Sequence, residues 1–160
     1  RNDAVKSFPS SYSPKAISHL KFLKHLEGDV FSVLDNLSSA DSSENNPHTV
    51  ATDSFDNGES VERVFKFLIV TVRREYRRQG IAKRLVELSL DLAQSLKFRY
   101  VVTTATSART QRMFEDSFGF TTIRSIDIAS YRENGLPIFA NVAEDNPAAK
   151  LMVKQMVIDF

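Results

Sequence analysis

One short segment of the sequence has the residue types and the spacing to bind a negatively charged ligand. Residues 77–83 read Arg-Arg-Gln-Gly-Ile-Ala-Lys and follow an apolar run, so we expect them at a strand-to-helix junction. The first N–H groups of a helix have no partners within it, and the helix dipole adds partial positive charge there. Gly80 and the small Ala82 let a phosphate approach these groups closely. With three basic side chains beside them, this segment predicts a pyrophosphate-binding turn.

The same residues have a plainer interpretation as a solvated turn. Arginine pairs are usually exposed, so Arg73, Arg74, Arg77 and Arg78 are also compatible with a hydrophilic loop. A glycine at such a junction is often only a turn residue. The segment has neither the G-x-x-x-x-G-K-[ST] spacing of the Walker phosphate loop nor the G-x-G-x-x-G of the Rossmann fold. On physical grounds alone, the phosphate interpretation is favoured.

A strand, a helix and a second strand must position this turn. The run from Phe65 to Val72 is apolar and β-branched, which predicts a buried strand, and Tyr100–Thr104 predicts another. The helix between them is amphipathic, with five large apolar residues on one face: Ile81, Leu85, Leu88, Leu92 and Leu96. This order is a βαβ unit, whose right-handed crossover makes the two strands parallel neighbours.

The flanking segments predict packing elements and turns. Ser13-Pro14 begins a helix over residues 14–27, Asp29 caps a shorter helix to residue 37, and the polar residues 38–60 predict a long mobile loop. Downstream we expect a helix capped by Ser107 that ends near residue 117, a strand over 120–128, a hairpin turn at Asn134-Gly135, and a last apolar run over 151–158.

The composition fits one globular domain and excludes several classes of protein. The chain has 160 residues, 42% of them hydrophobic and 26% charged, and 21 basic residues balance 20 acidic ones. This balance argues against nucleic-acid binding, and the absence of cysteine excludes disulfides and cysteine zinc sites. Three scattered histidines predict no metal site. Because no signal peptide or run of ~20 apolar residues is visible, we expect a cytoplasmic protein with no membrane partner.

Two linked motifs resemble the GNAT superfamily of N-acetyltransferases. R-R-Q-G-I-A, at residues 77–82, is similar to the R/Q-x-x-G-x-G/A signature of that family, and its surroundings resemble the family's fourth strand and third helix. T-T-A-T-S-A-R-T-Q-R-M-F-E-D-S-F-G-F, at residues 103–120, resembles the fifth strand and fourth helix. Its A-T-S-A-x-x-Q-R run is similar to arylalkylamine N-acetyltransferase-like proteins of invertebrates. The resemblance covers roughly residues 65–120.

The resemblance implies a fold and a cofactor. The fold would be α/β, a three-layer arrangement with a mixed sheet, and the parallel strands at 65–72 and 100–104 would splay apart towards their C-terminal ends. Acetyl-CoA would lie in that gap as the co-substrate. The residues expected to contact it are Val70, Val72, Arg77, Arg78, Gln79, Gly80, Ile81, Ala82, Lys83, Thr106, Ser107, Gln111 and Phe114.

The resemblance also implies direct acetyl transfer to a small primary amine of the arylalkylamine kind. The amine would attack the thioester carbonyl while a base removes its proton, and an acid would protonate the thiolate. Phe114 stands where many family members carry an acidic Tyr, so Ser107 and Thr110 become candidates for that role. For Ser107 the simpler role of helix N-cap is favoured. Arg78 occupies a place where Gly is frequent in the family.

The segment before Phe65 does not show the three strands with which the family fold begins. We therefore expect a partial domain over residues 1–160 that starts after the third strand, with the usual catalytic Glu outside it; Glu62 is a weak substitute. Such a chain would expose a sheet edge and an apolar face, which favours association. We expect it to bind CoA poorly and to acetylate nothing measurably on its own.

Two other functions compete with amine acetylation. A protein N-acetyltransferase would need an acidic or peptide-binding groove, of which the sequence gives no sign. A non-catalytic acyl-CoA-binding or interaction module would keep the cofactor turn and lose the chemistry. Phe114 and the missing front half favour this module for the chain as given.

Overall fold

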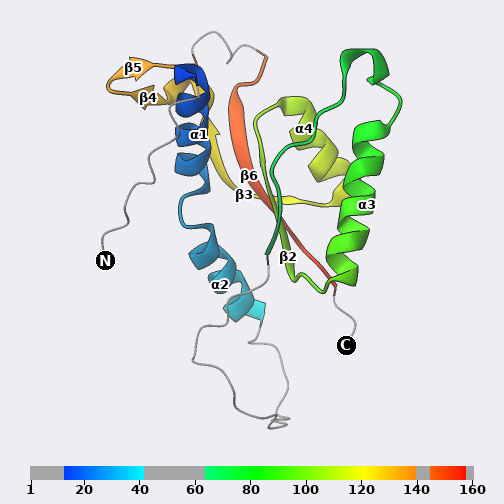
Figure 1. Cartoon of the computed structure of the whole chain (residues 1–160). Coiled ribbons are helices and arrows are strands. Elements are labelled where there is room, and N and C mark those ends of the chain that lie inside the picture. The colour runs from blue at the N-terminus through cyan, green and yellow to red at the C-terminus, as the bar shows by residue number, and fades with distance from the viewer. Residues whose placement is uncertain (1–12, 42–63, 140–144, 158–160) are drawn as a thin grey trace. The chain divides into compact units, whose positions relative to one another are not determined.

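The computed structural model describes residues 13–41, 64–139 and 145–157. It is an α/β fold with a mixed sheet, as predicted (Figure 1). The four-stranded sheet has the order β1-β2-β6-β3, and a separate hairpin pairs β4 with β5. The strands are β1 (Val64–Phe67), β2 (Tyr100–Ala105), β3 (Thr121–Asp127), β4 (Arg132–Glu133), β5 (Leu136–Pro137) and β6 (Ala148–Gln155).

The chain divides into two compact units, which are described separately. The first contains residues 1–28 and 104–152, and the second contains residues 29–103 and 153–160. Strands β2 and β6 each contribute residues to both units.

In the second unit, β1 and β2 form the predicted parallel pair. Val64 pairs with Tyr100, and the ladder ends where Phe67 pairs with Thr103. The expected strand over residues 65–72 is therefore wrong at its C-terminal end, because residues 68–73 leave the ladder. Leu68 and Ile69, the first two residues after the ladder, are 76% and 83% exposed. The two strands consequently separate after four residue pairs.

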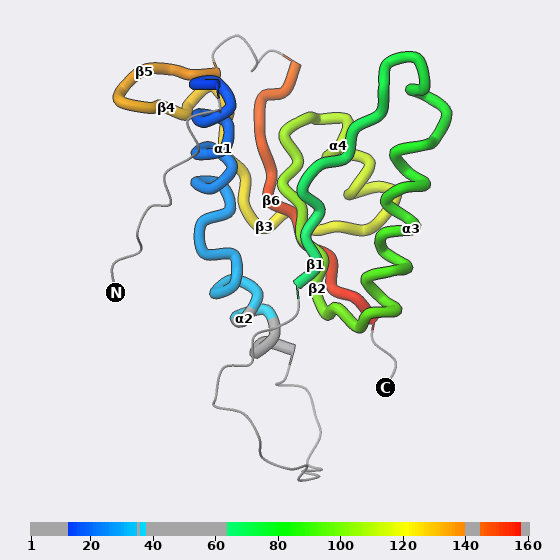
Figure 2. Tube along the Cα trace, in the orientation of Figure 1, coloured from blue at the N-terminus to red at the C-terminus, as the bar shows by residue number. Residues whose placement is uncertain are grey.

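The path from β1 to β2 runs through the 3₁₀ turn η1 (Arg74–Tyr76) and the helix α3 (Ile81–Ser95), as Figure 2 traces. Helix α3 buries Val86, Leu90 and Ala93. The five large apolar residues that the sequence placed on one face of this helix, from Ile81 to Leu96, are not buried. Their side chains are between 37% and 51% exposed. The 3.6-residue period identified a helix correctly, but it did not tell which part of its apolar surface is buried.

Helix α2 (Val30–Asp41) also belongs to the second unit and is longer than predicted. Asp29 caps it, since its carboxylate accepts a hydrogen bond from the Ser32 backbone N–H at 3.3 Å. Leu34 is buried. Most of the loop expected over residues 38–60, and Glu62 with it, lies outside the described residues.

The first unit begins with helix α1 (Pro14–Glu27), whose predicted ends are confirmed. Ser13 Oγ accepts a hydrogen bond from Ala16 N, and Gly28 follows the last turn. Phe22 is buried against the rings of Tyr131 and Phe139, with ring centroids 5.0 and 5.2 Å away. Contacts between sequence-distant aromatic residues therefore position α1.

The rest of the first unit follows β2. Ser107 begins helix α4 (Ala108–Arg112), which continues as a π-helical turn, η2 (Met113–Ser117). Strand β3 leads through the 3₁₀ turn η3 (Ile128–Ser130) to the hairpin. Asn134 and Gly135 both have positive φ, 52° and 79°, which confirms the predicted turn between β4 and β5.

Candidate functional site

The N-terminus of α3 in the second unit has the backbone geometry of an anion site. Gly80 is the N-cap residue, in the left-handed region at φ 76°, and gives the helix no side-chain acceptor. The first intrahelical bond runs from Arg84 N to Gly80 O at 2.9 Å. The N–H groups of the first turn therefore point out of the helix without intrahelical partners.

There is open space in front of this turn. A Cβ atom built on Gly80 would meet no heavy atom within 4 Å. Residues 77–81 are all exposed. A phosphate can therefore approach the backbone of Gly80 at the place that a side chain would fill.

The basic side chains around the turn divide into two kinds. Arg77 Nε donates to Val72 O at 3.1 Å, so this guanidinium stabilises the loop itself. Arg73 pairs with Glu75 at 2.7 Å, and Arg84 pairs with Glu87 at 3.1 Å. By contrast, the side chains of Arg78 and Lys83 are exposed and bond to none of the described residues. These two can turn towards a bound anion without breaking a bond to any residue that the structure describes.

The stretch that follows β1 in the second unit has backbone groups that could bind a ligand. Val70 and Val72 are half-buried and lie in the stretch that leaves the β1–β2 ladder. Their peptide groups are therefore not used by β2.

In the first unit, the residues after β2 form a capped helix start. Ser107 Oγ accepts a hydrogen bond from Thr110 N at 3.2 Å and lies 3.1 Å from Thr110 Oγ1. The N-cap role predicted for Ser107 is confirmed by this geometry. Thr106 is half-buried beside it. The paired hydroxyls of Ser107 and Thr110 thus lie shortly after the end of β2 and could donate a proton there.

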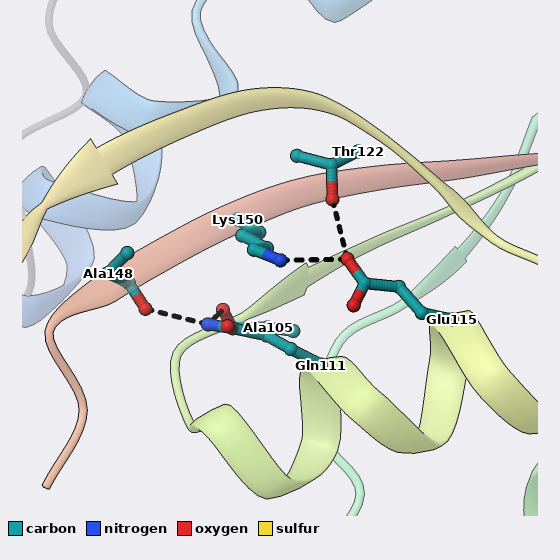
Figure 3. Close-up of polar contacts among 6 residues, drawn as sticks. All are labelled: Ala105, Gln111, Glu115, Thr122, Ala148 and Lys150. Atoms are coloured by element: carbon teal, nitrogen blue, oxygen red, sulfur yellow. Dashed lines mark hydrogen bonds and ion pairs between the residues drawn. The ribbon is translucent and has the colours of Figure 1, made fainter.

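Two polar contacts attach α4 and its π-helical turn to the neighbouring strands, as Figure 3 shows. The buried Gln111 amide donates to Ala105 O at 3.0 Å and to Ala148 O at 2.6 Å. Gln111 therefore uses both amide hydrogens to hold the end of β2 and the start of β6. Its role as a cofactor contact stays a prediction.

The second contact is an ion pair between the π-helical turn and β6. Glu115 accepts bonds from Lys150 Nζ at 2.8 Å and from Thr122 Oγ1 at 3.0 Å (Figure 3). The hydrogen bond from Lys150, and after it that from Thr122, lowers the pKa of Glu115 below its ordinary value. Sequence inspection missed this group, because its members are up to 35 positions apart.

Phe114 is part of the apolar interior of the first unit. It is 1% exposed, and its ring lies 4.8 Å from that of Phe120 and 6.3 Å from that of Phe118. Its ring has no proton to donate. Lining of the cofactor by Phe114 also stays a prediction.

One carboxylate near β2 was not predicted from the sequence. Glu27, the last residue of α1, accepts a hydrogen bond from Thr104 Oγ1 at 3.1 Å. Both residues belong to the first unit, but 77 positions separate them. No local motif signals this pair, since Glu27 reads in sequence as an ordinary polar residue at a helix end.

The described residues contain neither a metal site nor a membrane-spanning helix. They contain no cluster of three His, Asp or Glu that could hold a metal ion. None of the described helices combines the length and the apolar character needed to cross a membrane.

Residues 52–120 match the family model of the Acetyltransferase (GNAT) family. The matched segment includes the Gly80 turn, α3, β2 and α4. Among curated proteins, no sequence matches this chain.

Several solved structures are similar to the chain. Arylalkylamine N-acetyltransferase 2 from Aedes aegypti is 36% identical, with a TM-score of 0.54, over 59% of this chain and 43% of its own. A mosquito arylalkylamine N-acetyltransferase-like 5b is 24% identical, with a TM-score of 0.48, over 53% and 40%. The C-terminal condensation domain of Ebony, in complex with beta-alanyl-dopamine, is 19% identical, with a TM-score of 0.62, over 97% and 63%.

The Aedes and Ebony structures agree on the fold, and the chain covers only part of each similar protein. It spans less than half of both mosquito proteins and less than two thirds of the Ebony domain. At 19% identity the likeness to the Ebony domain concerns the fold alone. The family match and the Aedes structure both agree with the signature at residues 77–82. Residues 52–120 are therefore similar to the acetyltransferase (GNAT) family, in sequence and in the fold of the Aedes structure.

Proposed function

We propose that this chain is part of an acetyl-CoA-dependent N-acetyltransferase that acts on a small primary amine. The observation that carries the proposal is the start of α3, where a left-handed Gly80 with open space before it begins a helix without a side-chain cap. This arrangement suits the pyrophosphate of CoA. The arylalkylamine class of substrate rests on the 36% identity to the Aedes enzyme.

In the proposed reaction, the amine nitrogen attacks the thioester carbonyl carbon of acetyl-CoA. The C–N bond forms, the C–S bond breaks, and CoA leaves as a thiolate. The first turn of α3, with Arg78 and Lys83, would hold the pyrophosphate, and the backbone of Val70 and Val72 would bind the pantetheine arm. These groups fix the thioester in place and so reduce the entropy cost of the reaction.

Two proton transfers complete the reaction. A base must take the proton of the attacking amine. The Ser107–Thr110 hydroxyl pair is the proposed proton source for the thiolate.

A non-catalytic acyl-CoA-binding module is the second candidate. The residue type at position 114 favours this module, since a phenylalanine has no acidic proton to give to the thiolate. The test is acetyl-CoA titration by thermal shift, followed by a panel of aryl- and alkylamines on the full-length protein with detection of free CoA thiol. Binding with amine-dependent thiol release supports the enzyme, and binding without release supports the module. Absence of binding would contradict both.

A further inference from the structure

The positive charge of the chain is concentrated around the turn at Gly80. Residues 73–87 contain six basic side chains and two acidic ones, whereas the whole chain has a net charge of +1. The rest of the chain is therefore negative on balance. The six basic residues are Arg73, Arg74, Arg77, Arg78, Lys83 and Arg84. A local surplus of this kind attracts a ligand with several negative charges.

Most of these cations have a bonding partner or lie where the pyrophosphate would bind. Three of them are bonded to described residues of the second unit: Arg73, Arg77 and Arg84. Two more, Arg78 and Lys83, flank the first turn of α3 and would hold the pyrophosphate. Arg74 remains. Its side chain is exposed and bonds to none of the residues that the structure describes.

The backbone of Arg74 is held in a closed turn, although its side chain is free. Within η1, Tyr76 N donates to Arg73 O at 3.0 Å and Arg77 N donates to Arg74 O at 3.3 Å. The Arg77 guanidinium, bonded to Val72 O at 3.1 Å, closes the same loop. The turn ends four positions before Gly80. Because this backbone is already ordered, Arg74 can bind an anion at a smaller entropy cost than a residue of an open loop.

The proposed ligand carries a second phosphate group that suits this free guanidinium. Besides its pyrophosphate, CoA has a 3′-phosphate monoester on the ribose. Such a monoester has a charge between about −1.5 and −2 at pH 7. A guanidinium can donate two parallel N–H bonds to its oxygens. We propose that Arg74 binds the 3′-phosphate and makes the site prefer CoA to 3′-dephospho-CoA. This inference rests on the proposed function, since it takes CoA as the ligand.

Calorimetric titration with the two ligands tests the assignment. Because 3′-dephospho-CoA keeps the pyrophosphate, its binding reports on the turn at Gly80 without the second phosphate. We expect the full-length wild type to bind CoA about fivefold or more tightly than 3′-dephospho-CoA. Arg74→Gln should bring the ratio of the two affinities close to one by weakening CoA binding alone. Its affinity for 3′-dephospho-CoA should stay at the wild-type value.

Arg73→Gln is the matched control. It removes the same charge one position away, from a side chain that is already paired with Glu75 at 2.7 Å. Its affinity ratio should remain that of the wild type, which separates direct contact from a general loss of positive charge. Equal binding of both ligands by the wild type, a ratio that persists in Arg74→Gln, or the same fall in both variants would overturn the assignment and leave the proposed function standing. Binding of neither ligand would contradict both.

Discussion

At the residue scale, the turn before α3 contains two residues in the left-handed region. Gly80 adopts φ 76° and Arg78 adopts φ 66°. Glycine reaches this region without strain, while a residue with a Cβ is strained there. The structure thus explains why glycine suits position 78 in this turn, and it implies that Arg78 is retained at a cost in stability.

This strain makes a stability prediction. Arg78→Gly should raise the free energy of unfolding by up to about 1 kcal/mol, because the relief of left-handed strain exceeds the added freedom of the unfolded chain. Arg74→Gly, in the neighbouring 3₁₀ turn, lacks that relief and should destabilise. Urea denaturation of both variants measures this difference. Equal effects at the two positions would show that the left-handed backbone carries no strain.

The Glu115–Lys150 pair predicts how stability depends on pH. Because the folded-state pKa of Glu115 is lowered, its contribution is present above about pH 5 and is lost as the pH falls through the folded value. Glu115→Gln should cost about 0.5–1 kcal/mol at pH 7 and almost nothing at low pH. Lys150→Met should remove the same pH-dependent contribution to the free energy of unfolding. A cost of Glu115→Gln that does not change between about pH 7 and pH 3 would contradict this account.

At the scale of elements, variants of Ser107 can distinguish its structural role as the N-cap of α4 from a chemical role in the reaction. Ser107→Ala should cost about 1 kcal/mol, because α4 loses the side-chain acceptor for Thr110 N. Ser107→Asp keeps a good N-cap and should retain stability. If activity also survives in Ser107→Asp, the serine serves only as a cap; loss of kcat in this stable variant would assign it a part in the reaction. Denaturation and kinetics on the same samples give both answers.

Local sequence signals correctly predicted those elements whose ends are marked by capping or turn residues. Ser13 with Pro14 fixed the start of α1, and Asn134-Gly135 fixed the hairpin turn. Signals that depend on neighbours failed. The apolar run after Phe67 reads as strand, but the ladder of β1 with β2 ends at Phe67.

In the candidate site too, local features could be predicted from the sequence and contacts between distant residues could not. The turn at Gly80 was predictable, because a glycine at a strand-to-helix junction is a local feature with a local consequence. The contacts of Gln111 with β6 and of Glu27 with Thr104 join residues 37 and 77 positions apart. Only the folded chain brings such residues together, so spacing along the sequence could not reveal them.

At the scale of the whole molecule, cofactor binding should be visible as added stability. A ligand at about a hundred times its Kd stabilises the folded state by about 2.7 kcal/mol. For a chain of this size, that corresponds to a rise in Tm of roughly 5–10 °C. We expect acetyl-CoA and CoA to produce this shift in thermal unfolding and adenosine to produce little, since adenosine lacks the pyrophosphate. An equal shift with adenosine would mean that the turn at Gly80 is not the anchoring site.

The measurement that tests the central claim most directly is calorimetric titration of CoA into the wild type, Gly80→Val and Gly135→Val. Gly80 and Gly135 form a matched pair, with φ 76° and 79° and no heavy atom within 4 Å of an added Cβ. Both variants should therefore lose similar stability, and circular dichroism can verify that both remain folded. We predict that only Gly80→Val loses CoA binding, while Arg78→Ala binds less than about tenfold more weakly, because backbone N–H groups hold the pyrophosphate. Unchanged CoA binding by Gly80→Val, or a larger loss in Arg78→Ala, would contradict the account.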